Sequence, residues 1–169
     1  MARVYISAGS NQNRETHLGN AVRALRLAFG ELLLSPVYES PAVGFAGEPF
    51  FNLVIGFDTR QSPQVLAKNL RRIEANEGRR RRAERFSART LDLDLLLYED
   101  HVISQDRVQI PRHEILAFAF VLKPLADILP EGIHPHTGYS YRRHWRMFQT
   151  RHPDQAANLK PLPNPHLET

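Results

Sequence analysis

The sequence has no cysteine among its 169 residues. A disulfide framework, a thiolate nucleophile and a cysteine-ligated zinc or iron–sulfur site are therefore excluded, and nothing argues for an oxidising compartment. Long apolar runs are also missing. The N-terminus reaches Gly9 after a short apolar stretch that has neither the length of a membrane span nor the apolar region of a signal peptide. We therefore expect a cytoplasmic protein with no membrane contact.

The two common glycine-rich nucleotide motifs are absent as well. Neither G-x-x-x-x-G-K-[ST] nor G-x-G-x-x-G occurs, which disfavours P-loop ATPases, protein kinases and Rossmann dehydrogenases. The serines lack the context of a nucleophile elbow, so a serine triad has no support. If this chain binds a nucleotide, side chains must hold the phosphates in place of glycine-loop amides.

Positive charge is concentrated in one segment. The formal net charge is +4, and residues 78–89 (GRRRRAERFSAR) contain six arginines and one glutamate, so the rest of the chain is close to neutral. A focused cluster of this kind favours an anion site over a generally basic surface. A solvated helix end or an exposed loop is the alternative interpretation of an arginine run taken alone.

The length fits one domain, and 42% hydrophobic residues suffice to fill one core. Hydrophobic periodicity predicts strands over residues 3–8, 31–40, 52–58 and 90–98, with one helix over 18–29 and a second over 63–78. Pro36 breaks the apolar stretch of the second strand, which is consistent with an edge or a bulge near the proline, and residues 41–49 are expected to form a long loop. The order βαββαβ predicts an α+β ferredoxin-like sandwich, in which helices pack on an antiparallel sheet.

The C-terminal part of the chain has a weaker pattern. Residues 110–129 predict one or two short helices around Pro124, and residues 140–148 predict another. We expect one domain over residues 1–150 that includes these extra helices. A proline-rich, loosely held tail is expected over residues 151–169, which contain four of the twelve prolines.

Asp92 and Asp94 alternate with leucines in the strand predicted over residues 90–98. Residues i and i+2 of a strand project from the same face, roughly 6.6 Å apart, so two carboxylates can converge on hard cations. Because arginines stand directly upstream, the pattern indicates a site for a magnesium polyphosphate, whose oxygens guanidinium groups bind bidentately. A strand with a solvated polar face is the simpler alternative.

Histidine and aromatic residues give weaker signals. His134 and His136 are possible ligands of a transition metal together with His113, but no fixed ligand spacing is present, and a turn carrying histidines is the favoured interpretation. Asn52 follows a pair of phenylalanines where the long loop meets a strand. An amide beside aromatic rings suits a flat heterocycle with a donor–acceptor edge, although most buried phenylalanines belong to the core.

Taken together, these segments resemble the 6-hydroxymethyl-7,8-dihydropterin pyrophosphokinase family of folate biosynthesis. The resemblance covers about residues 3–130 and rests on Gly9-Ser10-Asn11, Tyr38-x-Ser-Pro-x-x-Gly44, Phe-Phe-Asn52, Glu74-x-x-x-Gly-Arg79, Arg89-x-Leu-Asp92-Leu-Asp94-Leu and Phe120-Val-Leu-x-Pro-Leu. It implies a ferredoxin-like α+β fold. It also implies magnesium-dependent transfer of diphosphate from ATP to the hydroxymethyl oxygen of the pterin, with release of AMP.

The resemblance also implies roles for particular residues. Asp92 and Asp94 would hold two magnesium ions. The pterin would be bound by Ser40, Pro41, Val43, Gly44, Phe50, Asn52 and Phe120. The nucleotide would be bound by Arg79, Arg81, Arg85, Arg89, Arg112 and His113. The residues expected to be required for transfer itself are Arg79, Arg81, Arg89 and Asp94, while Glu74 would support the conformation of the site.

The sequence departs from the family pattern near residue 112. The segment reads Pro111-Arg112-His113, and Phe118 stands where the family commonly has an arginine, so Arg112 or His113 would supply the late cationic contact. One alternative is therefore a catalytically weak or redirected relative that binds ATP and pterin. The other is a basic RNA-binding α+β module, which leaves the two strand aspartates unexplained because carboxylates repel backbone phosphates. We expect small-molecule substrates, no nucleic-acid partner and a monomer.

Overall fold

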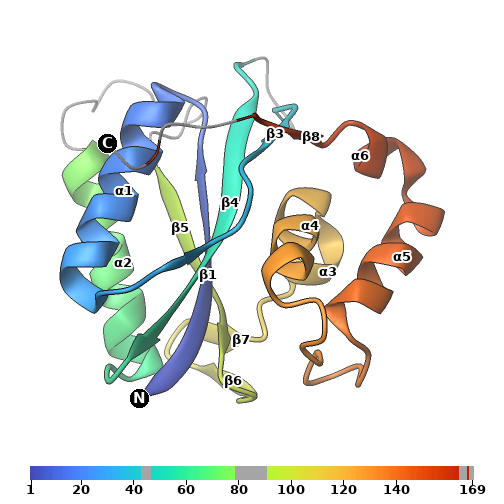
Figure 1. Cartoon of the computed structure of the whole chain (residues 1–169). Coiled ribbons are helices and arrows are strands. Elements are labelled where there is room, and N and C mark those ends of the chain that lie inside the picture. Colours follow the sequence, from blue (N-terminus) through green and yellow to red (C-terminus); the bar gives the residue numbers. More distant parts are fainter. Residues whose placement is uncertain (43–46, 79–90, 164–166, 168–169) are drawn as a thin grey trace.

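An antiparallel sheet forms the centre of the molecule in a computed structural model, which describes residues 1–42, 47–78, 91–163 and 167 (Figure 1). Its strands follow the order β5-β1-β4-β3-β8, with β2 also paired to β4. These strands are β1 (Ala2–Ser10), β2 (Leu33–Leu34), β3 (Tyr38–Ser40), β4 (Phe50–Thr59), β5 (Asp92–Tyr98) and β8 (Lys160–Pro161). The βαββαβ order and the antiparallel pairing confirm the predicted ferredoxin-like α+β fold.

Two long helices cover one face of the sheet (Figure 1). They are α1 (Arg14–Phe29) and α2 (Pro63–Gly78). Alternate residues of β1, such as Val4 and Ile6, are fully buried in one cluster with Leu18 and Leu25 of α1. Tyr5, which lies between them, is buried in a different cluster, so the direction of the side chains alternates along β1 as the sequence pattern predicts for a strand.

Helices from the C-terminal half cover the second face, so the molecule has three layers (Figure 1). α4 (Ala119–Ile128) packs on the sheet with α3 (Glu114–Ala117) beside it, while α5 (Tyr141–Arg151) and the short α6 (Pro153–Ala157) lie on the outer side of α4. The other set of strand residues, including Tyr5, Val54 and Leu96, is buried in a second cluster with Leu122 of α4. A hairpin of β6 (Ile103–Gln105) and β7 (Val108–Ile110), which the sequence analysis did not predict, connects β5 to α3. Within the described ranges, no helix combines the length and the hydropathy of a membrane span.

The strand predicted over residues 31–40 is divided at the predicted place. Ser35 lies between β2 and β3 and exchanges two hydrogen bonds with Val54 of β4: its N–H donates to the carbonyl (2.9 Å), and its Oγ accepts from the backbone N–H (2.8 Å). Pro36 has no N–H to donate, so the ladder cannot continue through it. The serine hydroxyl thereby satisfies a backbone group of β4 beside the interruption.

The described part of the tail is attached to the body. β8 pairs with β3, and the Leu162 N–H donates to the Val37 carbonyl (2.9 Å). Leu159 and Leu167 are both buried, the second of them in the core cluster beneath α1. The composition predicts a loosely held tail, whereas these residues are attached to the body, because β3 offers a sheet edge and the two leucines supply apolar contacts between the prolines.

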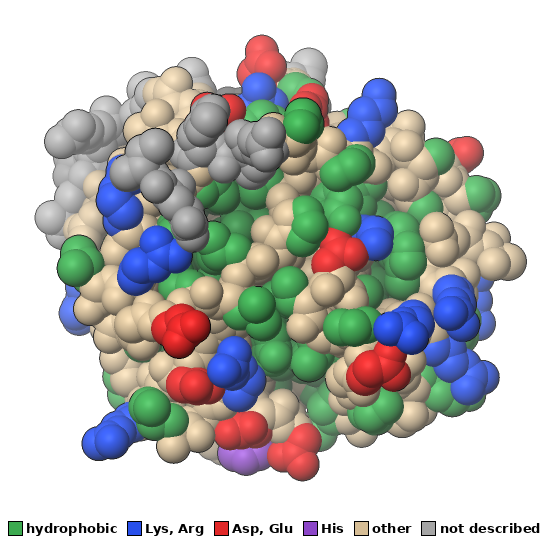
Figure 2. Space-filling view, viewed as in Figure 1, with side chains coloured by type: hydrophobic (Ala, Val, Ile, Leu, Met, Phe, Trp, Pro, Cys, Tyr) green, Lys and Arg blue, Asp and Glu red, His purple; other side chains and the backbone are tan. Residues whose placement is uncertain are grey.

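Basic side chains gather at the α5 edge of the molecule (Figure 2). α5 carries Arg142, Arg143, Arg146 and Arg151, all of them exposed. This is a second concentration of positive charge besides the arginine segment. The net charge of the chain outside residues 78–89 does not reveal these arginines, because acidic residues elsewhere balance their charge.

Candidate functional site

A cleft of about 600 Å³ opens between the second face of the sheet and the segment that leads through α3 into α4. This volume lies within the range of about 300–1,000 Å³ that is typical of small-molecule sites. The cleft is lined by Ser7, Ala8, Gly9, Ser40, Pro41, Phe50, Asn52, Asp92, Asp94, Arg112, Glu114, Phe118, Phe120 and Val121. The cleft therefore brings together three predicted features: the strand that carries Asp92 and Asp94, the Asn52 amide with its aromatic neighbours, and part of the segment around Arg112 and Phe118.

Asp92 and Asp94 begin β5 and both line the cleft. Leu93 lies between them and is buried on the opposite face, in the core beneath α1 and α2. The register places Gly9 opposite Asp92 and Ser7 opposite Asp94. Gly9 has no side chain and Ser7 has a small one, so the two carboxylates border open space. Both carboxylates lie on the same face of β5, as the alternation of strand residues predicts.

Arg112 brings a cation to this end of the cleft. Its N–H donates to the Leu96 carbonyl (3.0 Å), which holds its backbone beside β5. Its Nη2 lies 3.4 Å from Asp94 Oδ1, and its Nε lies 2.9 Å from Glu114 Oε2, a close contact that is not aligned as a hydrogen bond. His113, by contrast, has a side chain that is 70% exposed and is not among the described residues of the cleft wall.

The cleft also holds a fixed amide, on the other side of Gly9 from Asp92. Asn52 is 6% exposed, and its Nδ2 donates to Ser40 Oγ (3.0 Å). Gly9 lies opposite Asn52 in the β1–β4 ladder, and a Cβ at this glycine would stand 2.7 Å from Asn52 Oδ1. The missing side chain at Gly9 therefore makes room for the amide, a role that the sequence alone did not indicate.

Three phenylalanines border the cleft near the amide. Phe50 belongs to β4, while Phe118 and Phe120 come from the junction of α3 and α4. The rings of Phe118 and Phe120 stack, with centroids 5.0 Å apart and an angle of 17° between their planes. The sequence analysis singled out Phe118 only as a departure from the family pattern, whereas the structure places it in the cleft wall, stacked against Phe120.

Glu74 connects α2 to the acidic strand. Its Oε1 accepts a hydrogen bond from the Leu93 N–H (2.7 Å), which occupies a backbone donor of an edge strand between the two aspartates. Burial raises the pKa of Glu74 to about 7; the Leu93 hydrogen bond opposes this shift, and the negative charges of Asp92 and Asp94 add to it. The supporting role that the resemblance implies for this residue stays a prediction.

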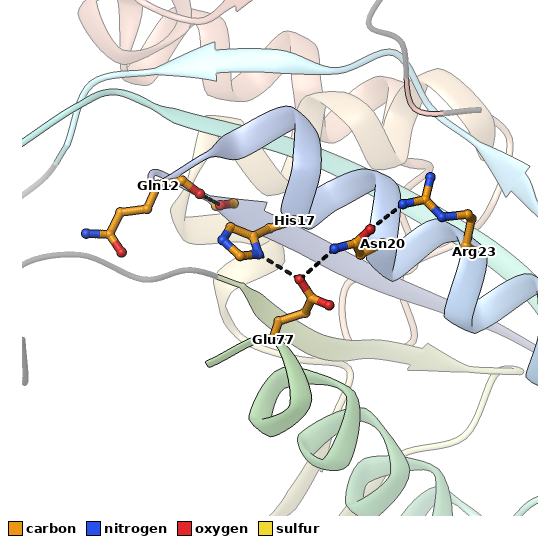
Figure 3. A network of polar contacts seen from close by, with 6 residues as sticks. Gln12, His17, Asn20, Arg23 and Glu77 are labelled. Atoms are coloured by element: carbon orange, nitrogen blue, oxygen red, sulfur yellow. Dashed lines mark hydrogen bonds and ion pairs between the residues drawn. The ribbon is translucent and has the colours of Figure 1, made fainter. Parts of the chain in front are cut away.

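A polar network fastens the last turn of α2 to α1 (Figure 3). Glu77 Oε2 lies 2.7 Å from His17 Nδ1 and accepts from Asn20 Nδ2 (3.0 Å), and Arg23 donates to Asn20 Oδ1. His17 is only 9% exposed. The network lies where α2 ends and the arginine segment begins in the sequence.

Some predicted site residues fall outside the described part of the chain. They are Val43, Gly44, Arg79, Arg81, Arg85 and Arg89. The roles assigned to them stay predictions.

The histidines form a turn, as the favoured interpretation expected. His134 Nδ1 accepts from the His136 N–H (3.2 Å), and the ring of His144 lies 5.6 Å from that of His134. In the described ranges, no group of three histidine or acidic side chains is arranged to hold a metal ion, so His134, His136 and His113 form no such site. Burial, together with the neighbouring imidazoles of His144 and His136, lowers the pKa of His134 to about 4.

Comparisons with known proteins give a consistent result. The family model of 7,8-dihydro-6-hydroxymethylpterin-pyrophosphokinase (HPPK) matches residues 5–130. A 2-amino-4-hydroxy-6-hydroxymethyldihydropteridine pyrophosphokinase of Pseudomonas aeruginosa is 39% identical over 133 residues, which cover 76% of this chain and 82% of the relative. The protein of the same name from Aquifex aeolicus is 34% identical over 137 residues, which cover 80% of this chain and 85% of the relative.

A solved structure shows the same fold. The wild-type HPPK-DHPS of Plasmodium falciparum superposes with a TM-score of 0.74 at 12% identity. The match covers 95% of this chain and 48% of that one, so the present chain spans about half the length of the solved chain. At this identity the likeness concerns the fold alone.

Proposed function

The chain belongs to the 7,8-dihydro-6-hydroxymethylpterin-pyrophosphokinase family, and we propose that it transfers the diphosphate of ATP to 6-hydroxymethyl-7,8-dihydropterin with release of AMP. It is an ATP-dependent pyrophosphokinase of folate synthesis. The observation that carries the detailed proposal is the cleft itself. One cavity joins an amide flanked by aromatic rings to a pair of carboxylates with an arginine beside them.

The amide end suits the pterin. A pterin is a flat heterocycle whose edge carries both donors and acceptors, and Asn52 offers both kinds of group from a buried, fixed side chain. Phe50 and Phe120 provide apolar surfaces beside it, and the stacked ring of Phe118 supports Phe120. Ser40 and Pro41 complete this wall, and Val43 and Gly44 would extend it.

The acidic end suits the phosphates. The donor set of Asp92 and Asp94 consists of carboxylate oxygens, which fit Mg²⁺, and these two residues would hold the two ions, which neutralise phosphate oxygens when bound. Arg112 reaches this end, so we assign to it, in preference to His113, the cationic contact with the nucleotide that Phe118 does not supply. The arginines at positions 79, 81, 85 and 89 would add further contacts to the phosphates.

The reaction follows from holding both substrates in one cleft. The hydroxymethyl oxygen forms a bond to the β-phosphorus while the bond from that phosphorus to the oxygen of the AMP moiety breaks, and the proton of the hydroxyl group passes to solvent. The chain contributes by placing these atoms in line and by supplying positive charge near the transferred oxygens. Because the pterin oxygen is itself the attacking atom, no side chain of the protein needs to act as a nucleophile.

The test is a turnover assay on the purified protein with 6-hydroxymethyl-7,8-dihydropterin and MgATP. We expect AMP and the pterin diphosphate to form in equal amounts, and no product when EDTA replaces magnesium. ADP as the product, or AMP formation that does not depend on the pterin, would contradict the proposal. The presence of Phe118 in the cleft favours one second candidate, a weak relative; binding of both substrates without AMP formation would identify it.

A further inference from the structure

Arg14 stands at an electrostatically unfavourable place. It is the first residue of α1, a helix of 16 residues. The N-terminus of a helix carries a partial positive charge, so a cation in the first turn weakens the helix when nothing else holds it. The residue before it, Asn13, makes no side-chain capping bond. A contact outside the helix must therefore account for the position of the arginine.

That contact is with the beginning of β4. Arg14 Nη1 donates to the Pro49 carbonyl (2.9 Å), and its guanidinium lies 3.9 Å from the centroid of the Phe51 ring. Pro49 has no N–H, so its carbonyl is the one main-chain group through which it can be held. A weaker second link runs from Asn11 Nδ2 to the Glu48 carbonyl (3.4 Å). Arg14 and Asn11 thus hold the two residues in front of β4, and Arg14 also contacts its second residue, Phe51.

The gripped residues adjoin the cleft. Phe51 is 7% exposed and belongs to the core cluster beneath α1. Its neighbours Phe50 and Asn52 point to the opposite face of β4, because successive strand residues alternate, and both line the cleft. Arg14 holds Pro49 and Phe51 on one face of the sheet. These contacts therefore fix the positions of Phe50 and Asn52, which enter the cleft on the other face.

We infer that Arg14 is a positioning residue for the heterocycle end of the cleft. It does not line the cleft; it acts through Phe51 and the Pro49 carbonyl on Phe50 and Asn52. The inference rests on the proposed function for its substrate, and it predicts a selective effect. Loss of the Arg14 contacts with Pro49 and Phe51 weakens binding of the pterin. Binding of the nucleotide, which depends on β5 and Arg112, stays unchanged.

The test compares two methionine variants of the same helix. Arg14→Met removes the planar cation and its donors while it keeps a long side chain with good helix propensity. Arg26→Met, in the last turn of α1 and exposed, makes the same change of charge away from the cleft. We expect the KM for the pterin to rise about tenfold in Arg14→Met, with the KM for ATP within twofold of the wild type. Arg26→Met should leave both constants unchanged.

Arg14→Lys and hydrogen exchange complete the test. Lysine keeps a cation near the ring but lacks the planar fork, so we expect it to recover part of the loss in Arg14→Met. Amide exchange over residues 47–53 should be faster in Arg14→Met than in the wild type and unchanged in Arg26→Met. An unchanged pterin KM with unchanged exchange would overturn the inference and leave the function standing, as would an equal rise in both KM values. If the wild-type protein makes no AMP, the proposed function fails, and the exchange comparison still decides whether Arg14 holds this segment.

Discussion

Gly9→Ala should damage pterin binding while sparing the rest of the protein. A Cβ at this position would stand 2.7 Å from Asn52 Oδ1, whereas ordinary contact begins at about 3.4 Å, so the amide must move by about 0.7 Å. Asn52 has little freedom to do so, because it is 6% exposed and its Nδ2 donates to Ser40 Oγ. The displaced amide would lose one or two hydrogen bonds to the heterocycle.

The size of the effect follows from those bonds. Each contributes about 0.5–1.5 kcal/mol net, so the loss of one or two weakens binding by about 0.5–3 kcal/mol, or about 2- to 150-fold. Stability should change by less than about 1 kcal/mol, because an alanine reduces the entropy of the unfolded chain and thereby offsets part of the displacement. The assay is the KM for each substrate together with a fluorescence titration of the pterin, and we expect the KM for ATP to stay constant.

Gly19→Ala provides the matched control. A Cβ at Gly19 would meet its nearest neighbour, Arg23 Nη1, at 3.6 Å, which is an ordinary contact within α1. This variant should gain up to about 1 kcal/mol of stability from helix propensity and should keep wild-type kinetics. If Gly9→Ala bound the pterin as tightly as the wild type, the close approach of Gly9 and Asn52 would not be what shapes the site.

Three further predictions concern other parts of the molecule. Asp94→Ala should lower AMP formation by about 10²–10³-fold, whereas Asp58→Ala, which breaks a surface pair, should stay within twofold; similar rates for both would refute the role of the acidic pair. Because burial lowers the pKa of His134 to about 4 from 6.5, the folded chain binds fewer protons than the unfolded one, and stability falls as the pH falls through this window. Urea denaturation should show a loss of about 2 kcal/mol from this group between pH 7 and pH 5, and an equal loss in His134→Gln would contradict it. A double-mutant cycle of His17→Ala and Glu77→Ala should give a coupling energy above about 0.5 kcal/mol in chemical denaturation, and additive effects would argue against the α1–α2 contact.

The central elements of the fold were predictable because their signals are local. In β1 and the first half of β5, alternate side chains enter the core cluster beneath α1, and in α1 every third or fourth residue is buried. Both patterns follow from packing one face of an element against a core. The interruption at Pro36 is equally local, since proline lacks the N–H that a ladder needs. The β6–β7 hairpin was missed because its strands have three residues each, too few to show a period.

The attachment of the tail was also missed, for a different reason. Its composition is rich in proline, and that composition is typical of loosely held segments. What holds it is the edge of β3 and the apolar surface beneath α1, where Leu167 is buried. Neither feature appears in the sequence of the tail itself, because both belong to segments more than a hundred residues away.

By itself, the sequence determined the antiparallel α+β framework, the placement of Asp92 and Asp94 on one strand face, and the motifs that match the pterin pyrophosphokinases. Each of these depends on residues that are close together in the chain, so spacing alone expresses them. Only the tertiary structure decided that Gly9 makes room for Asn52, that Arg112 rather than His113 lines the cleft, and that Phe118 stacks on Phe120 in the cleft wall. These relations depend on strand register and on how helices pack across a sheet, which bring distant residues within a few ångströms.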